Sequence, residues 1–93
     1  MAKENAEKEK GIVGVAKSVL SEMGSMLNKK AECVVSINPD KDGWKVVIEV
    51  LERKAMPDSM DLLGRYEIKT NQDGEIQNYN QILLRHRNDA LET

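Results

Sequence analysis

A two-residue alternation between positions 42 and 53 constrains this fold more than any other feature of the sequence. Its even positions carry Trp44, Val46, Ile48 and Val50, whereas its odd positions mix apolar and charged residues. Successive side chains of a β-strand point to opposite sides of a sheet, so this pattern predicts a strand with one wholly apolar face. That face requires a cover, which the rest of the chain has to supply.

An amphipathic helix over residues 11–28 is the predicted cover. Its apolar residues recur at intervals of three and four. They are Ile12, Val15, Ala16, Val19, Leu20, Met23, Met26 and Leu27. Three glycines lower its helix propensity, so we expect packing against the sheet to hold it together. Residues 1–10 carry many charges and no apolar stripe, which predicts a frayed N-terminus.

Three further strands follow from alternation and turn signals. Residues 32–38 alternate weakly and end at the turn signal of residues 39–43, so they predict a hairpin with the opening strand. Pro57 interrupts the chain before a third strand over residues 60–70, and a turn at 71–74 leads to a last strand over 75–87. The predicted fold class is α+β: one domain, 1–93, with an N-terminal helix on a four-stranded antiparallel meander at 32–87 and a loose tail at 88–93.

The buried face of the last strand depends on the turn before it. A two-residue Asp73-Gly74 loop pairs Ile68 with Tyr79 and Gly64 with Leu83. A three-residue loop instead buries another set of residues. That set is Ile76, Ile82 and Leu84. A β-bulge would satisfy both patterns in turn, and Gly64 itself predicts either a bulge or a close approach by the helix.

Composition narrows the class of protein. The 93 residues suit one small domain with an aliphatic core, and the formal net charge of −2 argues against a general nucleic-acid-binding surface. No apolar run reaches the roughly 20 residues that span a bilayer, and we expect a cytoplasmic protein without membrane contact. The single cysteine excludes an internal disulfide.

The sequence predicts no enzyme, cofactor or metal site. Cys33 and His86 would form a catalytic pair only if the first and last strands met. Glu49 and Glu52 fall on opposite faces of their strand, so this carboxylate pair points apart, and a solvated rim is the simpler interpretation. No phosphate-binding glycine loop, nucleophile elbow or metal-ligand spacing is present.

Two surfaces are candidates for contact with partners. The first combines the mixed face of the central strand with the loop that follows it. Its residues are Val47, Glu49, Leu51, Arg53, Met56, Pro57, Asp58 and Asp61. The second is a local basic patch at Arg85, His86 and Arg87, which together with Lys45 and Arg65 offers an alternative route to nucleic acid.

Three blocks of the sequence together resemble the gas vesicle protein O family. The first is Asp42-Gly43-Trp44 with Val46, Glu49, Val50, Glu52 and Arg53. The second is Met56-Pro57-Asp58 with Asp61-Leu62-Leu63 and Tyr66-Glu67-Ile68. The third is Asp73-Gly74-Glu75 with Tyr79 and Arg87. The blocks span about half the chain in the family's order. The chain departs from the family pattern in its last strand, which typically has more arginine and a second tyrosine.

The resemblance implies a cytoplasmic, non-enzymatic accessory protein of gas vesicle assembly, associated with the vesicle through contacts with other gas vesicle proteins. The family's AAA-type ATPase, gas vesicle protein N, is one candidate partner, and a homo-oligomer is another state that we keep open. The resemblance also leaves an alternative function, the regulation of gas vesicle gene expression through the basic patch. No catalytic residue or cofactor is implied.

Overall fold

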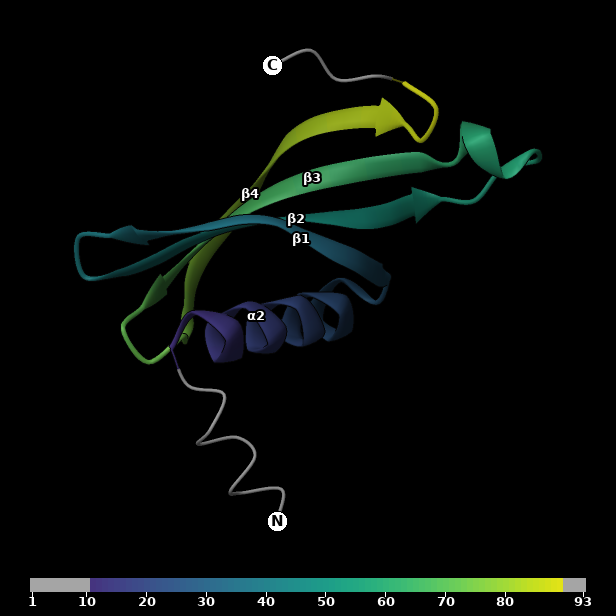
Figure 1. Ribbon diagram of the computed structural model, residues 1–93. Helices are drawn as coiled ribbons and strands as arrows, with labels where there is room; N and C mark the ends of the chain where they lie inside the picture. The colour runs from purple at the N-terminus through teal and green to yellow at the C-terminus, as the bar shows by residue number, and fades with distance from the viewer. Residues whose placement is uncertain (1–10, 90–93) are drawn as a thin grey trace.

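One helix lies across one face of a four-stranded sheet in the computed structural model, which describes residues 11–89 (Figure 1). The elements in chain order are α2 (Ile12–Leu27), β1 (Lys30–Asp40), β2 (Gly43–Arg53), the 3-10 turn η1 (Asp58–Met60), β3 (Leu62–Asn71) and β4 (Ile76–His86). Neighbouring strands are antiparallel, in the order β1-β2-β3-β4. The predicted α+β meander is confirmed. The frayed start predicted at 1–10 lies outside the described residues, as do residues 90–93.

The helix covers the apolar face of β2, as the sequence predicted. Val15, Val19 and Met23 are buried on its inner side. At its C-terminus Asn28 adopts the left-handed conformation, with φ 56°, and the chain turns directly into β1. The observed helix, 12–27, is within one residue of the predicted one at each end.

The core lies between α2 and the two central strands. Val46, Ile48 and Val50 of β2 are completely buried, and Tyr66 and Ile68 of β3 join them in the same cluster. The face of the sheet that α2 covers is called the helix face below, and the opposite one the open face. Trp44 belongs to the helix face but is only half-buried, because it lies at the second pair of β2 from the hairpin turn, near the end of the sheet.

The β1–β2 hairpin is tighter than predicted. Only Lys41 and Asp42 form the turn, and Pro39 lies within β1, where it pairs with Trp44. An edge strand tolerates proline because one side of it has no ladder to maintain. Gly43 is required by space: a Cβ atom there would lie 1.8 Å from the carbonyl oxygen of Thr70.

The last strand contains two irregularities. Ile68 pairs with Tyr79, the pair expected for a two-residue loop, although the observed loop spans residues 72–75 and a register shift between Lys69 and Thr70 leaves Gln77 unpaired. A second shift, between Arg65 and Tyr66, leaves Ile82 unpaired, so Gly64 faces Leu84 and not Leu83. The predicted bulge is therefore confirmed and the Gly64–Leu83 pair is wrong. Of the residues that a three-residue loop would bury, Ile76 packs against the core, whereas Ile82 and Leu84 are each 50% exposed.

Residues 88 and 89, the described part of the predicted loose tail, make backbone hydrogen bonds. The Asn88 amide donates to the Ser59 carbonyl at 2.8 Å, and the Asp89 amide donates to the His86 carbonyl at 2.9 Å. The Asn88 bond attaches the end of β4 to the loop between β2 and β3, and the Asp89 bond closes a turn at residues 86–89.

Candidate functional site

A buried carboxylate organises the open face of the sheet. Glu49 is only 5% exposed, and its Oε2 accepts hydrogen bonds from Arg65 Nη2 at 2.9 Å and from Arg85 Nε at 2.8 Å. Arg85 Nη2 also donates to Oε1 at 2.9 Å, so the Arg85–Glu49 pair is bidentate. Arg65 lies directly opposite Glu49 across the β2–β3 ladder, which places the two side chains on the same face.

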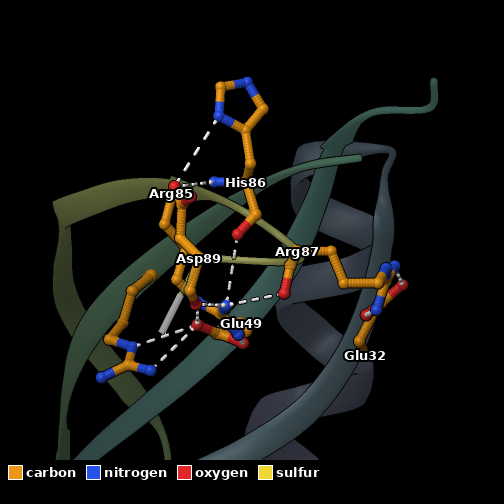
Figure 2. A network of polar contacts seen from close by, with 7 residues as sticks. Glu32, Glu49, Arg85, His86, Arg87 and Asp89 are labelled. Atoms are coloured by element: carbon orange, nitrogen blue, oxygen red, sulfur yellow. Dashed lines mark hydrogen bonds and ion pairs between the residues drawn. The ribbon is translucent and has the colours of Figure 1, made fainter. Parts of the chain in front are cut away.

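Arg85 also holds the chain that follows β4. Its Nη1 donates to the backbone carbonyls of His86, Arg87 and Asp89 at 3.1 to 3.3 Å. Figure 2 shows this guanidinium between Glu49 and the turn at residues 86–89. One side chain therefore connects β2, in the middle of the sheet, to the C-terminal turn.

A second arginine connects the first strand to the loop before β3. Arg87 donates to both carboxylate oxygens of Glu32, at 2.9 and 2.8 Å, and to Oδ2 of Asp61 at 3.0 Å (Figure 2 draws the Glu32 pair). Asp61 is 1% exposed, and its Oδ1 accepts the Ala55 amide at 2.8 Å. The contacts reach from β1 to the residue after β4 across the whole open face.

The charges in this network stabilise one another. Hydrogen bonding to Arg85 and Arg65 lowers the pKa of Glu49 in spite of its burial, and hydrogen bonding to Arg87 lowers the pKa of Glu32. The Ala55 amide, with help from Arg87, lowers the pKa of Asp61. All three carboxylates are therefore ionised at neutral pH and are satisfied by their partners.

A separate carboxylate network occupies the helix face. Glu52 accepts hydrogen bonds from Lys29, Tyr66 and Gln81. Burial raises the pKa of Glu52, but the bonds from Lys29 and Tyr66 outweigh it and the pKa falls; burial and the Glu52 contact raise the pKa of Tyr66 to about 12. Gly64 lies beneath this network, where a Cβ atom would come within 2.3 Å of a Glu52 oxygen. The close approach predicted at Gly64 is thus made by Glu52 and not by the helix.

The loop between β2 and β3 presents apolar side chains to solvent. Met56 is 93% exposed and Met60 is 41% exposed. The loop is held from within, because Met60 and Asp61 donate backbone hydrogen bonds to Pro57 and Asp58. The Ser59 and Ala55 contacts described above fix both of its sides.

The residues of the predicted partner surface differ in their exposure to solvent. Arg53, Met56, Pro57 and Asp58 are exposed, and Val47 and Leu51 are half-buried. We expected Glu49 and Asp61 to be exposed. This prediction is wrong, since both are buried by their arginine partners. Whether the remaining residues bind a partner stays a prediction.

The predicted basic patch is neutralised by carboxylates. Arg85 and Arg87 are the centres of the network, and Lys45 lies 3.7 Å from Glu67. His86 lies 3.7 Å from Asp89 at the surface. Arg85 and Arg87 therefore stabilise the open face, and carboxylates largely compensate their charge.

The other chemical candidates lie apart. Cys33 is on β1 and His86 on β4, the two opposite edges of the sheet, so these strands do not meet. Among residues 11–89, no group of three histidine, cysteine or carboxylate side chains is arranged to hold a metal ion. In the same range, no helix has the length and apolar character needed to cross a membrane.

Sequence reasoning missed the ion pairs that organise this face. The Glu49–Arg65 contact could have been predicted, because the hairpin register places these two opposite charges directly across the β2–β3 ladder. Glu32 and Arg87, by contrast, are separated by 55 residues and nothing local signals their meeting.

Comparison with known proteins gives a consistent result. A family model described as "Gas vesicle synthesis protein GvpO" matches residues 1–90. Gas vesicle protein O1 of Halobacterium salinarum is 37% identical over 62 residues, which is 67% of this chain and 51% of that protein. Gas vesicle protein O of Haloferax mediterranei is 38% identical over 63 residues, 67% of this chain and 44% of that protein.

A bacterial relative extends the match. Gas vesicle protein O of a Streptomyces species is 32% identical over 68 residues, covering 73% of this chain and 53% of that protein. The chain spans about half the length of the curated relatives it matches. No solved structure matches it significantly.

Proposed function

Because this chain belongs to the gas vesicle protein O family, we propose that it is a non-enzymatic accessory protein that acts in gas vesicle assembly by binding other gas vesicle proteins. The observation that carries this proposal is the exposure of Met56, 93%, on a loop whose backbone is held in place. Methionine adapts its shape to an apolar partner surface, and a fixed loop loses little conformational entropy on binding.

The contact surface that we propose is centred on this loop and continues onto the exposed end of β2. Met56 and Met60 supply its apolar centre, and Arg53 and Asp58 supply a charged rim. This composition is typical of protein–protein interfaces, where apolar anchors are surrounded by polar residues. The proposed place of action is the cytoplasm, at the growing vesicle, with gas vesicle protein N as one candidate partner.

The alternative role in gene regulation has less support. Contact with nucleic acid requires arginines and lysines that are available to phosphates, and affinity that falls steeply with salt. Here Arg85 and Arg87 are engaged by carboxylates. A mobility shift with vesicle-gene DNA at low salt, lost at moderate salt, would favour the regulator over the assembly factor.

The test is co-purification from cells that express the tagged protein with the other vesicle proteins. We expect Met56→Asp to reduce their recovery about tenfold, since a charge replaces an apolar anchor. The matched control is Val13→Asp, which changes a residue 53% exposed on the outer side of α2. Recovery with this control should match the wild type.

Salt and stability complete the design. Capture through an apolar anchor should persist at moderate salt, unlike capture through surface charges. Both variants should melt as the wild type does, because both positions are exposed. Unchanged recovery with folded Met56→Asp would refute the proposed surface.

A further inference from the structure

The two edges of the sheet differ in their protection against pairing with another strand. An edge strand carries unpaired backbone donors and acceptors, and natural proteins guard such edges with charges, proline and bulges. β1 contains Lys30, Glu32, Pro39 and Asp40, and its pairing with β2 is shifted at two places. Its edge is therefore well guarded.

β4 lacks charged residues over most of its length. The segment 76–84 contains none, although charged residues make up 32% of the chain. The C-terminal half of this segment is also apolar and open to solvent. Ile82 is 50% exposed, Leu83 36% and Leu84 50%. Two register shifts, which leave Gln77 and Ile82 without partners on β3, are the protection that this stretch has.

The N-terminal half of β4 lies beside a groove. The groove is on the helix face, between α2 and the start of β4, and has a volume of about 590 Å³. Met26, Ile76 and Tyr79 supply its apolar lining, with Glu22 at its side. Met26 is 50% exposed and Tyr79 is 40% exposed, so the groove is open to solvent.

In a two-fold symmetric dimer, the C-terminal half of β4 in one copy is complementary to the N-terminal half of β4 in the other. In antiparallel pairing of β4 with β4, the C-terminal half of each strand lies beside the N-terminal half of the other. The symmetry axis is perpendicular to the sheet, so both helix faces stay on the same side. Leu84 is on the helix face, because it pairs with Gly64, which pairs with Val50.

We propose that two copies of this chain associate through antiparallel pairing of their β4 strands near Asn80. The sheets then join into one sheet of eight strands, and Leu84 of each copy lies over the groove formed by Met26, Ile76 and Tyr79 of the other. The contact is isologous: the same patch is used twice, and the dimer is closed.

The chemistry of the segment favours a second copy over an unrelated strand. Asn80 lies at the symmetry axis, where its amide, which carries both donors and an acceptor, faces the same amide of the other copy without a charge mismatch. A neutral strand also meets its own copy without like charges in opposition. An unrelated extended segment fits one half of β4, whereas a second copy fits both.

Sedimentation equilibrium of the full chain under reducing conditions tests the association. We expect a dimer whose dissociation constant depends only weakly on salt, because the paired segment 76–84 carries no charge. Leu84→Lys should weaken the dimer about 100-fold, since each dimer then carries two buried, unpaired charges. The matched control is Val35→Lys, at a residue 41% exposed on the β1 edge, and it should leave the dimer unchanged.

Cysteine cross-linking tests the arrangement. In a Cys33→Ser background, Asn80→Cys should form an intermolecular disulfide under mild oxidation, because residues near the axis lie opposite their own copies. Val35→Cys in the same background should not. A circular dichroism melt confirms that each variant is folded.

Each possible result either supports or refutes the β4–β4 dimer. A concentration-dependent dimer that Leu84→Lys weakens and Asn80→Cys cross-links supports the proposal. A monomer at all concentrations refutes it, and so does a dimer that is sensitive to Val35→Lys but not to Leu84→Lys. The measurement uses the isolated protein, so its failure is distinct from a failure to capture vesicle proteins.

Discussion

The two faces of the sheet are covered in different ways. The helix face is covered by α2, and its central side chains, such as Ile48 and Ile68, are aliphatic and completely buried. On the open face the central side chain, Glu49, is a carboxylate that two arginines cover. Within residues 11–89 no helix lies on that face (Figure 1). The difference shows how arginine side chains can cover a sheet face on which residues 11–89 place no helix.

The arginines cover the open face because each makes several contacts at once. The stem of an arginine packs on apolar surface while its planar head bonds carboxylates and carbonyls. Leu63, opposite Arg85 in the β3–β4 ladder, is only 1% exposed although it is on the open face. Buried ion pairs contribute less net stability than a well-packed apolar layer, because desolvation offsets their attraction. The helix face should therefore dominate stability.

The strongest test of this comparison is a charge placed in the helix face. Ile48→Asp buries an unpaired carboxylate among aliphatic side chains, and we expect a loss of about 4 kcal/mol or more in the free energy of unfolding. Urea denaturation followed by circular dichroism measures it. The exposed control Val13→Asp should change stability by less than about 0.5 kcal/mol. An unchanged melting temperature for Ile48→Asp would contradict the assignment of this face.

The second test removes the charge at the centre of the open face. Glu49→Gln leaves Arg65 and Arg85 without their shared carboxylate, and we expect a loss of about 2 to 3 kcal/mol at neutral pH. The control on the same face is Glu67→Gln, whose partner Lys45 is 3.7 Å away, with an effect below about 1 kcal/mol. Equal losses for the two variants would show that Glu49 has no special role.

The third test titrates the same carboxylate with acid. Hydrogen bonding to Arg85 and Arg65 lowers the pKa of Glu49 in the folded protein, so its contribution is complete above the unfolded pKa of about 4.3 and is lost as the pH falls towards the folded pKa. The stability difference between wild type and Glu49→Gln should therefore shrink between pH 7 and about pH 3. Urea denaturation over this range measures the difference. A difference that grows in acid would reverse the sign and refute the argument.

The helix face was largely predictable from the sequence, because it is encoded locally. The period of Trp44 to Val50 and the three-and-four spacing of Val15, Val19 and Met23 are enough to predict both partners of the core. What the sequence did not predict was local geometry: the loop at residues 72–75 and the tight turn at Lys41-Asp42.

The open face was not predictable in the same way. Its contacts join residues distant in sequence, such as Glu32 and Arg87, and a charged residue on the outer face of a strand is equally consistent with a solvated surface. Several residues that carry the family resemblance turn out to form the two carboxylate networks. They are Glu49, Glu52, Asp61, Tyr66 and Arg87. These polar residues of the family pattern have structural roles in this chain that their spacing did not reveal.

The smallest expected effect separates the two arginines that share Glu49. Arg65 donates only to Glu49 among the hydrogen bonds of the network, whereas Arg85 bonds Glu49 twice and three backbone carbonyls besides. Arg65→Met keeps much of the stem and leaves the bidentate Arg85–Glu49 pair in place. We expect it to cost less than about 1 kcal/mol in urea denaturation.

Arg85→Met is the matched variant, and it should cost about 2 kcal/mol, because it removes the bidentate pair and also leaves the carbonyls of the turn at residues 86–89 without their donor. Hydrogen exchange adds a readout specific to position: the amides of Arg87 and Asn88 should lose protection in Arg85→Met and keep it in Arg65→Met. Equal costs and equal protection would mean that the open face depends on positive charge alone. The expected inequality would mean that it depends on one arginine that connects the middle of the sheet to the end of the chain.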